Sequence, residues 1–141
     1  MAFLEKQLEI KKSNIPGAGK GLFTKKLIKK GEIIVEYVGT VTTWKEVDHD
    51  NGANAYIYYV NRNHVIDARK HKKSMGRYAN DARGIQRLKG FRNNAHYVKD
   101  GDNIYIEASI NITSGDEILV SYGKEYWDVI RRNNALDHKK K

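Results

Sequence analysis

The pieces GRYANDA at residues 76–82, NNA at residues 93–95 and ASINITSGDEILVSY at residues 108–122 decide the fold of this chain. In the last piece, Ser114-Gly115-Asp116 predicts a turn, and the run at 117–121, with apolar residues at 118–120, predicts a strand. Ahead of it, an Asp-Gly turn at residues 100–101 joins two alternating runs and predicts a hairpin. This half of the chain is therefore read as short strands joined by tight turns.

The remaining residues continue the same pattern. Alternation predicts a strand at residues 8–11, and the segment after Gly21 also looks like a strand. A β-rich run follows at residues 33–39, and a second hairpin joins 56–60 to 64–67. Two helices are expected, a short one at 43–48 with Thr43 as N-cap and a longer one at 124–136. Many strands, few helices and frequent turns predict a mainly β fold.

Composition narrows the class of protein. A chain of 141 residues and 16.2 kDa predicts one domain. The absence of cysteine excludes disulfides and thiolate metal sites, and the five histidines lack ligand spacing, so no metal is expected. No apolar run reaches the length of a membrane span, and no signal-peptide pattern opens the chain. We therefore expect an intracellular protein, in the cytoplasm or at chromatin in the nucleus, without a membrane partner.

The formal net charge of +9 leaves three interpretations open. A basic surface can contact nucleic acid, including nucleosomal DNA. It can also attract an anionic cofactor or an acidic partner. The third interpretation is a solvated lysine surface with a basic tail at residues 138–141, which has no specific role.

The glycine-rich stretch at residues 16–21 does not bind a nucleotide by either common motif. A P-loop needs a first glycine at position 14 and Ser or Thr after Gly-Lys, but the chain has Asn14 and Gly21 there. A dinucleotide fingerprint starting at Gly17 would need glycine where Leu22 stands. A tight turn is the simple alternative.

Taken together, these motifs resemble the SET domain, the fold of many protein-lysine methyltransferases. The resemblance covers about residues 8–127 and rests on four motifs in family order. They are GKGLF at 19–23, KGE followed by EYVG at 30–39, the Asn80 and Asn94 segments, and GDEILVSY at 115–122. The chain is similar to small viral and bacterial SET proteins and to enzymes that monomethylate histones. Three departures occur in the Asn80 and Asn94 segments, with Asp81, Ala82 and Asn93 where the family usually has His, Ser and Pro.

The resemblance implies a β-clip of short sheets with a knot-like crossing and a C-terminal helix. It also implies four parts within a single domain of residues 1–141. These are an amino-terminal part at 1–43, a variable insert and hairpin at 44–73, a carboxyl-terminal part with the site at 74–122, and a flanking helix with a basic tail at 123–141.

The implied activity is transfer of a methyl group from S-adenosyl-L-methionine to a lysine amine of a protein, such as a histone tail. Tyr122 is the expected catalytic residue. The cofactor-binding residues are expected to be Lys20, Gly21, Leu22, Tyr56, Asn80, Asp81 and Trp127. The substrate channel is expected to be lined by Tyr56, Tyr58, Val120 and Tyr122. Asn94 is expected to support the crossing.

Two further expectations come from these residues. Val120 occupies a position where the family often has Tyr or Phe with a role in limiting methylation, so addition of more than one methyl is expected. The acidic residues Glu46, Asp48 and Asp50 could form a patch for a basic substrate, or merely a solvated face. The alternative to an enzyme is a degenerate SET domain that binds a peptide or nucleic acid without catalysis.

Overall fold

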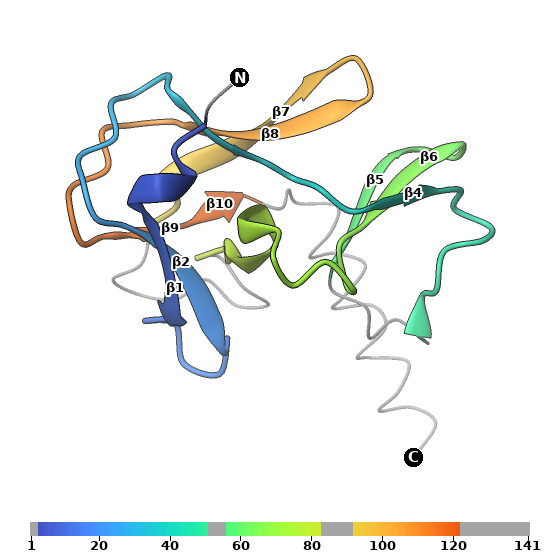
Figure 1. The fold of residues 1–141 in the computed structure, drawn as a ribbon, viewed down its shortest axis with the longest axis horizontal. Coiled ribbons are helices and arrows are strands. Elements are labelled where there is room, and N and C mark those ends of the chain that lie inside the picture. The colour runs from blue at the N-terminus through green and yellow to red at the C-terminus, as the bar shows by residue number, and fades with distance from the viewer. Residues whose placement is uncertain (1–2, 51–55, 83–91, 122–141) are drawn as a thin grey trace.

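The computed structural model describes residues 3–50, 56–82 and 92–121, and the fold is mainly β as predicted (Figure 1). Three small sheets make up the described chain. The first has the order β1 (Leu8–Lys12), β2 (Lys20–Thr24), β9 (Glu117–Ile118). The second has the order β10 (Val120–Ser121), β7 (Ala95–Asp100), β8 (Asn103–Ala108), β3 (Ile33–Glu36). The third has the order β4 (Thr40–Thr42), β6 (His64–Asp67), β5 (Ile57–Asn61).

Two 3-10 helices, η1 (Glu5–Gln7) and η3 (Met75–Tyr78), complete the described elements used below. The third sheet lies on one side of η3, and the first two sheets lie on the other (Figure 1). The predicted helix at 124–136 lies outside the described residues. The subdivision into four parts stays a prediction.

Both predicted hairpins form, because their turn residues suit the tight connection. In the β7–β8 hairpin, Asp100 pairs with Asn103, and Gly101 has φ of +61°, a conformation that glycine adopts without penalty. In the β5–β6 hairpin, Asn61 pairs with His64, and the side chain of Asn61 accepts a hydrogen bond from the backbone N–H of Asn63 at 2.9 Å.

Three local predictions were wrong. The run at 117–121 forms two strands in two different sheets, because its pairing partner changes from β2 to β7 at Leu119. The run at 33–39 is a strand only to Glu36. The segment at 43–48 is a turn and not a helix, although Thr43 Oγ1 does accept from the backbone N–H of Glu46 at 3.2 Å.

The main core lies between the first two sheets. It contains the fully buried side chains of Leu22, Ile34, Ile106 and Val120, which come from four different strands. A second, smaller cluster forms around Tyr37 and Ile66 and joins the third sheet to the rest of the domain. Tyr97 on β7 packs against both clusters.

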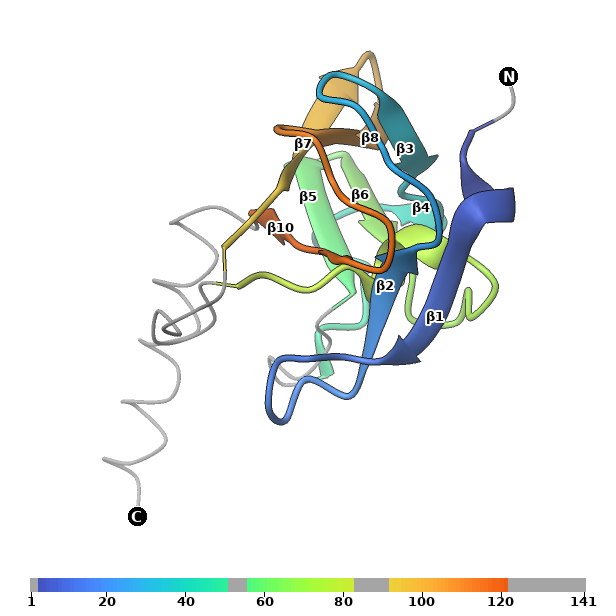
Figure 2. The same ribbon diagram turned by 90° about the vertical axis from the view of Figure 1, so that its left-hand side faces the viewer.

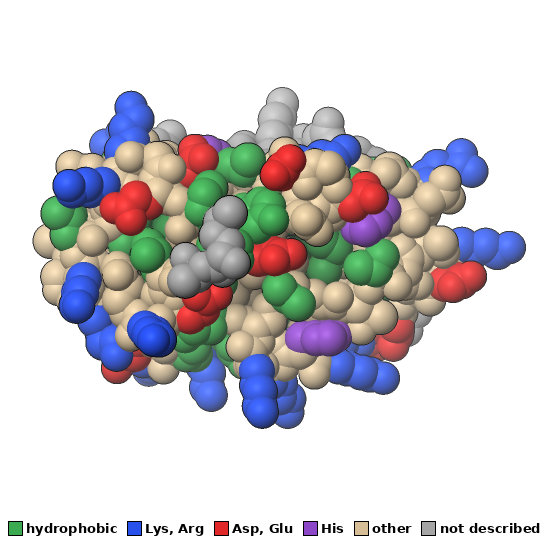
Figure 3. Space-filling view, turned by 45° about the horizontal axis from the view of Figure 1, so that its top comes forward, with side chains coloured by type: hydrophobic (Ala, Val, Ile, Leu, Met, Phe, Trp, Pro, Cys, Tyr) green, Lys and Arg blue, Asp and Glu red, His purple; other side chains and the backbone are tan. Residues whose placement is uncertain are grey.

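Charged side chains of both signs lie on the face of the domain that Figure 3 shows. On the face shown in Figure 3, lysine and arginine side chains lie mainly around the edge, and acidic and hydrophobic side chains lie nearer the middle. Within the described part of the chain, no helix is long and apolar enough to cross a membrane. Nor do these residues contain a group of three or more His, Cys, Asp or Glu side chains suited to a metal ion.

Candidate active site

The loop between β1 and β2 is fixed by a buried carboxylate from β9. Glu117 is only 5% exposed, and its oxygens accept from Ser13 Oγ at 2.6 Å and from the backbone N–H of Asn14 at 2.9 Å. A Cβ on Gly21 would lie 2.3 Å from Glu117 Oε2. Glycine is therefore required at position 21 because the carboxylate occupies the space of a side chain.

The outer part of this loop faces open space. Gly17 and Gly19 have φ of +78° and +73°, and a Cβ built on either would meet nothing within 4 Å. The loop is closed at its base, where the backbone N–H of Ser13 donates to the carbonyl of Gly19 at 2.8 Å. A loop that is closed at its base and has main-chain groups beside open space suits a ligand that is bound through the backbone.

Asn80 joins this loop to the segment that follows η3. Its Nδ2 donates to the carbonyl of Lys20 at 3.0 Å and lies 3.5 Å from Glu117 Oε2. Its own carbonyl accepts from the backbone N–H of Val120 at 2.8 Å. Asn80 therefore lies beside the predicted cofactor-binding positions Lys20 and Gly21, although 60 positions separate it from Lys20 in sequence.

Asn94 holds the crossing of two segments. Its Nδ2 donates to the carbonyl of Glu117 and its Oδ1 accepts from the backbone N–H of Leu119, both at 2.9 Å. The backbone of Leu119 also forms a parallel bridge with Asn80. Figure 2 shows the segment with β10 running beside the one that leads from η3 toward Ala82. One amide thus satisfies two backbone groups where β9 ends and β10 begins.

The three departures from the family pattern fit one another. Ala82 is buried and packs with Ile15 and Leu119, so an apolar residue suits its surroundings. Asp81 is 4% exposed and accepts a hydrogen bond from Asn93 Nδ2 at 2.8 Å. Asn93 Oδ1 accepts from the backbone N–H of Ala82, also at 2.8 Å.

A cluster of tyrosines lies beside the third sheet. The rings of Tyr58 and Tyr97 have centroids 4.9 Å apart, and Tyr37 lies 5.9 Å from Tyr58 and 6.0 Å from Tyr97. The hydroxyl of Tyr37 donates to the carbonyl of Tyr56 at 2.7 Å. Burial raises the pKa of the Tyr58 hydroxyl, so this phenol is uncharged at neutral and mildly alkaline pH.

Arg77 on η3 connects the tyrosine cluster to the Asn80 segment. Its guanidinium lies 4.1 Å from the ring centroid of Tyr56 and donates to the carbonyls of Ala68 and Arg69 at 2.9 and 2.6 Å. The helix η3, which leads into Asn80, therefore also contacts Tyr56.

Among the remaining predicted residues, Leu22 and Val120 are fully buried in the main core. The predicted residues Tyr122 and Trp127 lie outside the described residues. Tyr37, Tyr97 and Glu117 were not among the predicted site residues. Tyr37 and Glu117 lie inside motifs that resemble the family, and that position was the available signal.

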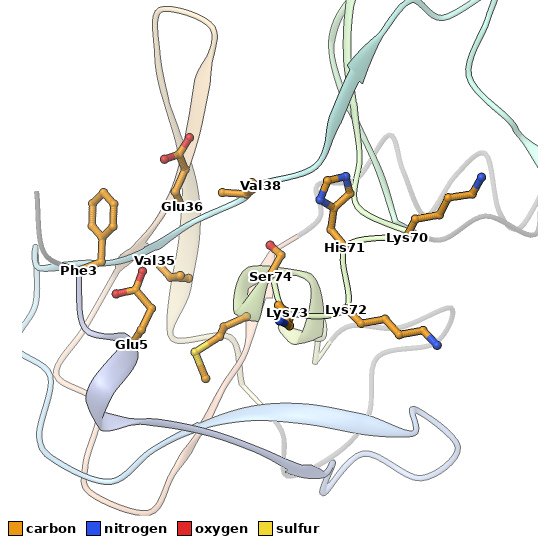
Figure 4. Close-up of a pocket in the computed structure, with 11 residues that line it drawn as sticks. Phe3, Glu5, Val35, Glu36, Val38, Lys70, His71, Lys72, Lys73 and Ser74 are labelled. Carbon is orange, nitrogen blue, oxygen red and sulfur yellow. The ribbon is translucent and has the colours of Figure 1, made fainter.

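A groove of about 650 Å³ lies elsewhere, between η1, β3 and the segment before η3 (Figure 4). Its apolar lining includes Phe3, Val35, Val38 and Met75, and its rim carries acidic residues on one side and Lys70, Lys72 and Lys73 on the other. None of the described residues predicted for the site lines this groove.

The insert does not present a free acidic patch. Arg69 lies 2.9 Å from the carboxylate of Asp50 and 3.9 Å from that of Asp48. Two of the three acidic side chains considered for substrate binding therefore face a cation of the same domain, which favours the solvated-face interpretation.

The geometry defines a mainly β domain in which a glycine loop, an asparagine segment and a strand crossing meet. A sequence model of the SET domain matches residues 19–123. The chain belongs to the SET-domain family.

Relatives in three organisms have names that describe their activity or domain. N-lysine methyltransferase KMT5A-A of Danio rerio is 26% identical over 88% of this chain and 38% of its own length. Histone-lysine N-methyltransferase set-1 of Caenorhabditis elegans is 27% identical over 94% of this chain and 57% of its own length. The variant-silencing SET domain-containing protein of Plasmodium falciparum is 32% identical over 86% of this chain and 5% of its own length. The chain therefore spans only part of these relatives.

Among solved structures, the methyltransferase domain of human PR domain-containing protein 2 is similar, with a TM-score of 0.61 and 26% identity. The match covers 83% of this chain and 77% of that domain. The likeness in fold therefore extends over most of the chain.

Proposed function

We propose that the protein is an S-adenosyl-L-methionine-dependent protein-lysine N-methyltransferase. The observation that carries the proposal is the junction of Lys20, Gly21 and Asn80 at the crossing held by Asn94. The names of the relatives, lysine and histone-lysine methyltransferases, support the same reaction class.

The residues present fit the cofactor. The open loop at residues 16–20 offers main-chain groups for its methionine part, and the backbone near Asp81 would receive the adenine end. S-adenosyl-L-methionine, when bound, supplies an electrophilic methyl group. The rest of the reaction depends on how the chain orients the substrate amine and controls its proton.

The lysine substrate must lose a proton before it can attack. A free lysine amine has a pKa of about 10.4, and an apolar channel beside a cation lowers that pKa because it disfavours the ammonium form. Tyr58 and Tyr97 supply aromatic walls, and the raised pKa of Tyr58 keeps its phenol neutral. Alignment of the amine with the methyl group then supplies several kcal/mol of rate enhancement.

The substrate is proposed to be a protein lysine, with a histone tail as the first candidate. Set-1 and the Set8 protein of Drosophila pseudoobscura pseudoobscura are named histone-lysine methyltransferases, which favours chromatin as the location. Nucleosomal DNA is the further partner that the net charge of +9 would favour.

The first test is transfer of labelled methyl to core histones and to a cell lysate. We expect Tyr122→Phe to reduce transfer by about 100-fold or more, because one hydroxyl that orients the reacting groups is lost. Tyr59→Phe is the matched control, since Tyr59 is 51% exposed and should keep full activity.

Each outcome of this test is informative. Label in histones points to chromatin, and label only in the lysate keeps the enzyme with another substrate. Absence of label in both, together with absence of cofactor binding by calorimetry, would instead support the degenerate binding module.

The product should include more than monomethyl-lysine. Val120 has no hydroxyl at the position where the family often has a Tyr or Phe that limits methylation. Mass spectrometry of a peptide product at long reaction times should detect dimethyl- or trimethyl-lysine. A spectrum that contains only the monomethyl product would contradict this prediction.

A further inference from the structure

Asp81 and Asn93 are two departures from the family pattern that contact each other directly. Asn93 Nδ2 donates to Asp81 Oδ1, and Asn93 Oδ1 accepts from the backbone N–H of Ala82, each at 2.8 Å. The side chain of Asn93 therefore uses both ends of its amide on adjacent residues of one segment.

This contact restrains the segment of residues 80–82 on a second side. On the first side, the carbonyl of Asn80 is bonded to the backbone N–H of Val120, and the side chain of Asn80 to Lys20. Asn93 directly precedes Asn94, which holds the crossing. The backbone from Asn80 to Ala82 is thus held between the crossing and the residue pair.

We propose that Asp81 and Asn93 form one positioning unit, which sets the backbone of residues 80–82 for the adenine end of the cofactor. This inference rests on the proposed function. In this proposal neither side chain contacts the transferred methyl group. Their role is to keep the adjacent main-chain groups in place, so their loss should first weaken cofactor binding.

The chemistry of the two side chains makes the test asymmetric. A carboxylate only accepts hydrogen bonds, whereas an amide both donates and accepts. Asn93→Asp places two carboxylates face to face and removes the donor. Asp81→Asn keeps an acceptor for Asn93 Nδ2. The double variant with both changes again places a donor opposite an acceptor, and the carboxylate introduced at position 93 can still accept from the N–H of Ala82.

The experiment measures the Kd of S-adenosyl-L-methionine by calorimetry at mildly alkaline pH, and the unfolding temperature without cofactor. We expect Asn93→Asp to raise the Kd about tenfold or more and Asp81→Asn to raise it less than about threefold. The double variant should return to the Kd of Asp81→Asn. Ile28→Val, at a fully buried position in the core, should lower the unfolding temperature without a change in Kd.

Three results would overturn the inference. The first is an unchanged Kd in Asn93→Asp, and the second is a double variant that binds no better than Asn93→Asp. The third is a Kd that follows the unfolding temperature in every variant, including Ile28→Val, because that marks a purely structural role. Failure of the wild-type protein to bind the cofactor is a different result. It would remove the proposed function, and coupling seen only in the unfolding temperature would then identify a structural pair.

Discussion

Gly21→Ala should abolish cofactor binding and lower the free energy of unfolding by about 3 kcal/mol or more. The added Cβ would lie 2.3 Å from Glu117 Oε2 and 3.2 Å from Ser13 Cα. The backbone of Ser13 cannot move freely because it closes the loop with Gly19, so Glu117 must leave its position. Its hydrogen bonds to Ser13 and Asn14 would then break inside the protein.

Gly17→Ala is the matched control in the same loop. Gly17 has a positive φ, which Gly21 does not, and its Cβ would meet nothing within 4 Å. Its substitution should therefore cost only about 1–2 kcal/mol of backbone strain. Urea unfolding and calorimetry with S-adenosyl-L-methionine measure the two effects. Equal losses of unfolding free energy in the two variants would contradict the assignment of Glu117 as the side chain that requires glycine at position 21.

Asn94→Ala should lower the free energy of unfolding by about 2–5 kcal/mol. The substitution leaves the carbonyl of Glu117 and the N–H of Leu119 without the amide that satisfies both. Each buried backbone group without a partner costs about 1–3 kcal/mol. Because the crossing also brings Asn80 to Val120, cofactor binding should weaken in the same variant.

Asn111→Ala is the matched control, because it removes an asparagine side chain that is not at the crossing. Asn111 Oδ1 accepts from the backbone N–H of Lys30 at 2.8 Å, but this hydrogen bond is exposed and water can replace it. We expect its loss to cost less than about 1 kcal/mol. Urea unfolding measures the free energy of unfolding of both variants. A similar decrease in the two would show that the crossing does not depend on Asn94.

Local patterns in the sequence were enough to predict most strands and both hairpins. Alternation of apolar and polar residues depends on the two-residue period of a strand, and Asp100-Gly101 suits a tight turn by itself. The turn at 43–48 was predicted as a helix because Thr43 suits an N-cap. In the structure Thr43 Oγ1 does accept from the backbone N–H of Glu46, but a single turn shares that bond with a helix.

The candidate site could be predicted in part. Lys20, Gly21 and Asn80 belong to motifs, and the structure brings them together. The tyrosine cluster required the structure, because Tyr37 follows β3 and Tyr97 lies on β7, whereas Tyr58 lies on β5. The acidic residues of the insert looked available in sequence, but Arg69 lies beside two of them after folding.

The amino-acid sequence by itself determined the mainly β class and the SET-domain family, because periodicity, turn residues and ordered motifs are all local properties. Only the tertiary structure decided that the run at 117–121 divides between two sheets and that Asp81 and Asn93 are partners. Both results depend on which distant segments cross, and hydrogen bonds between such segments form only when the whole chain packs. Asp81 and Asn93, which depart from the family pattern at separate places in the sequence, therefore contact each other in the fold.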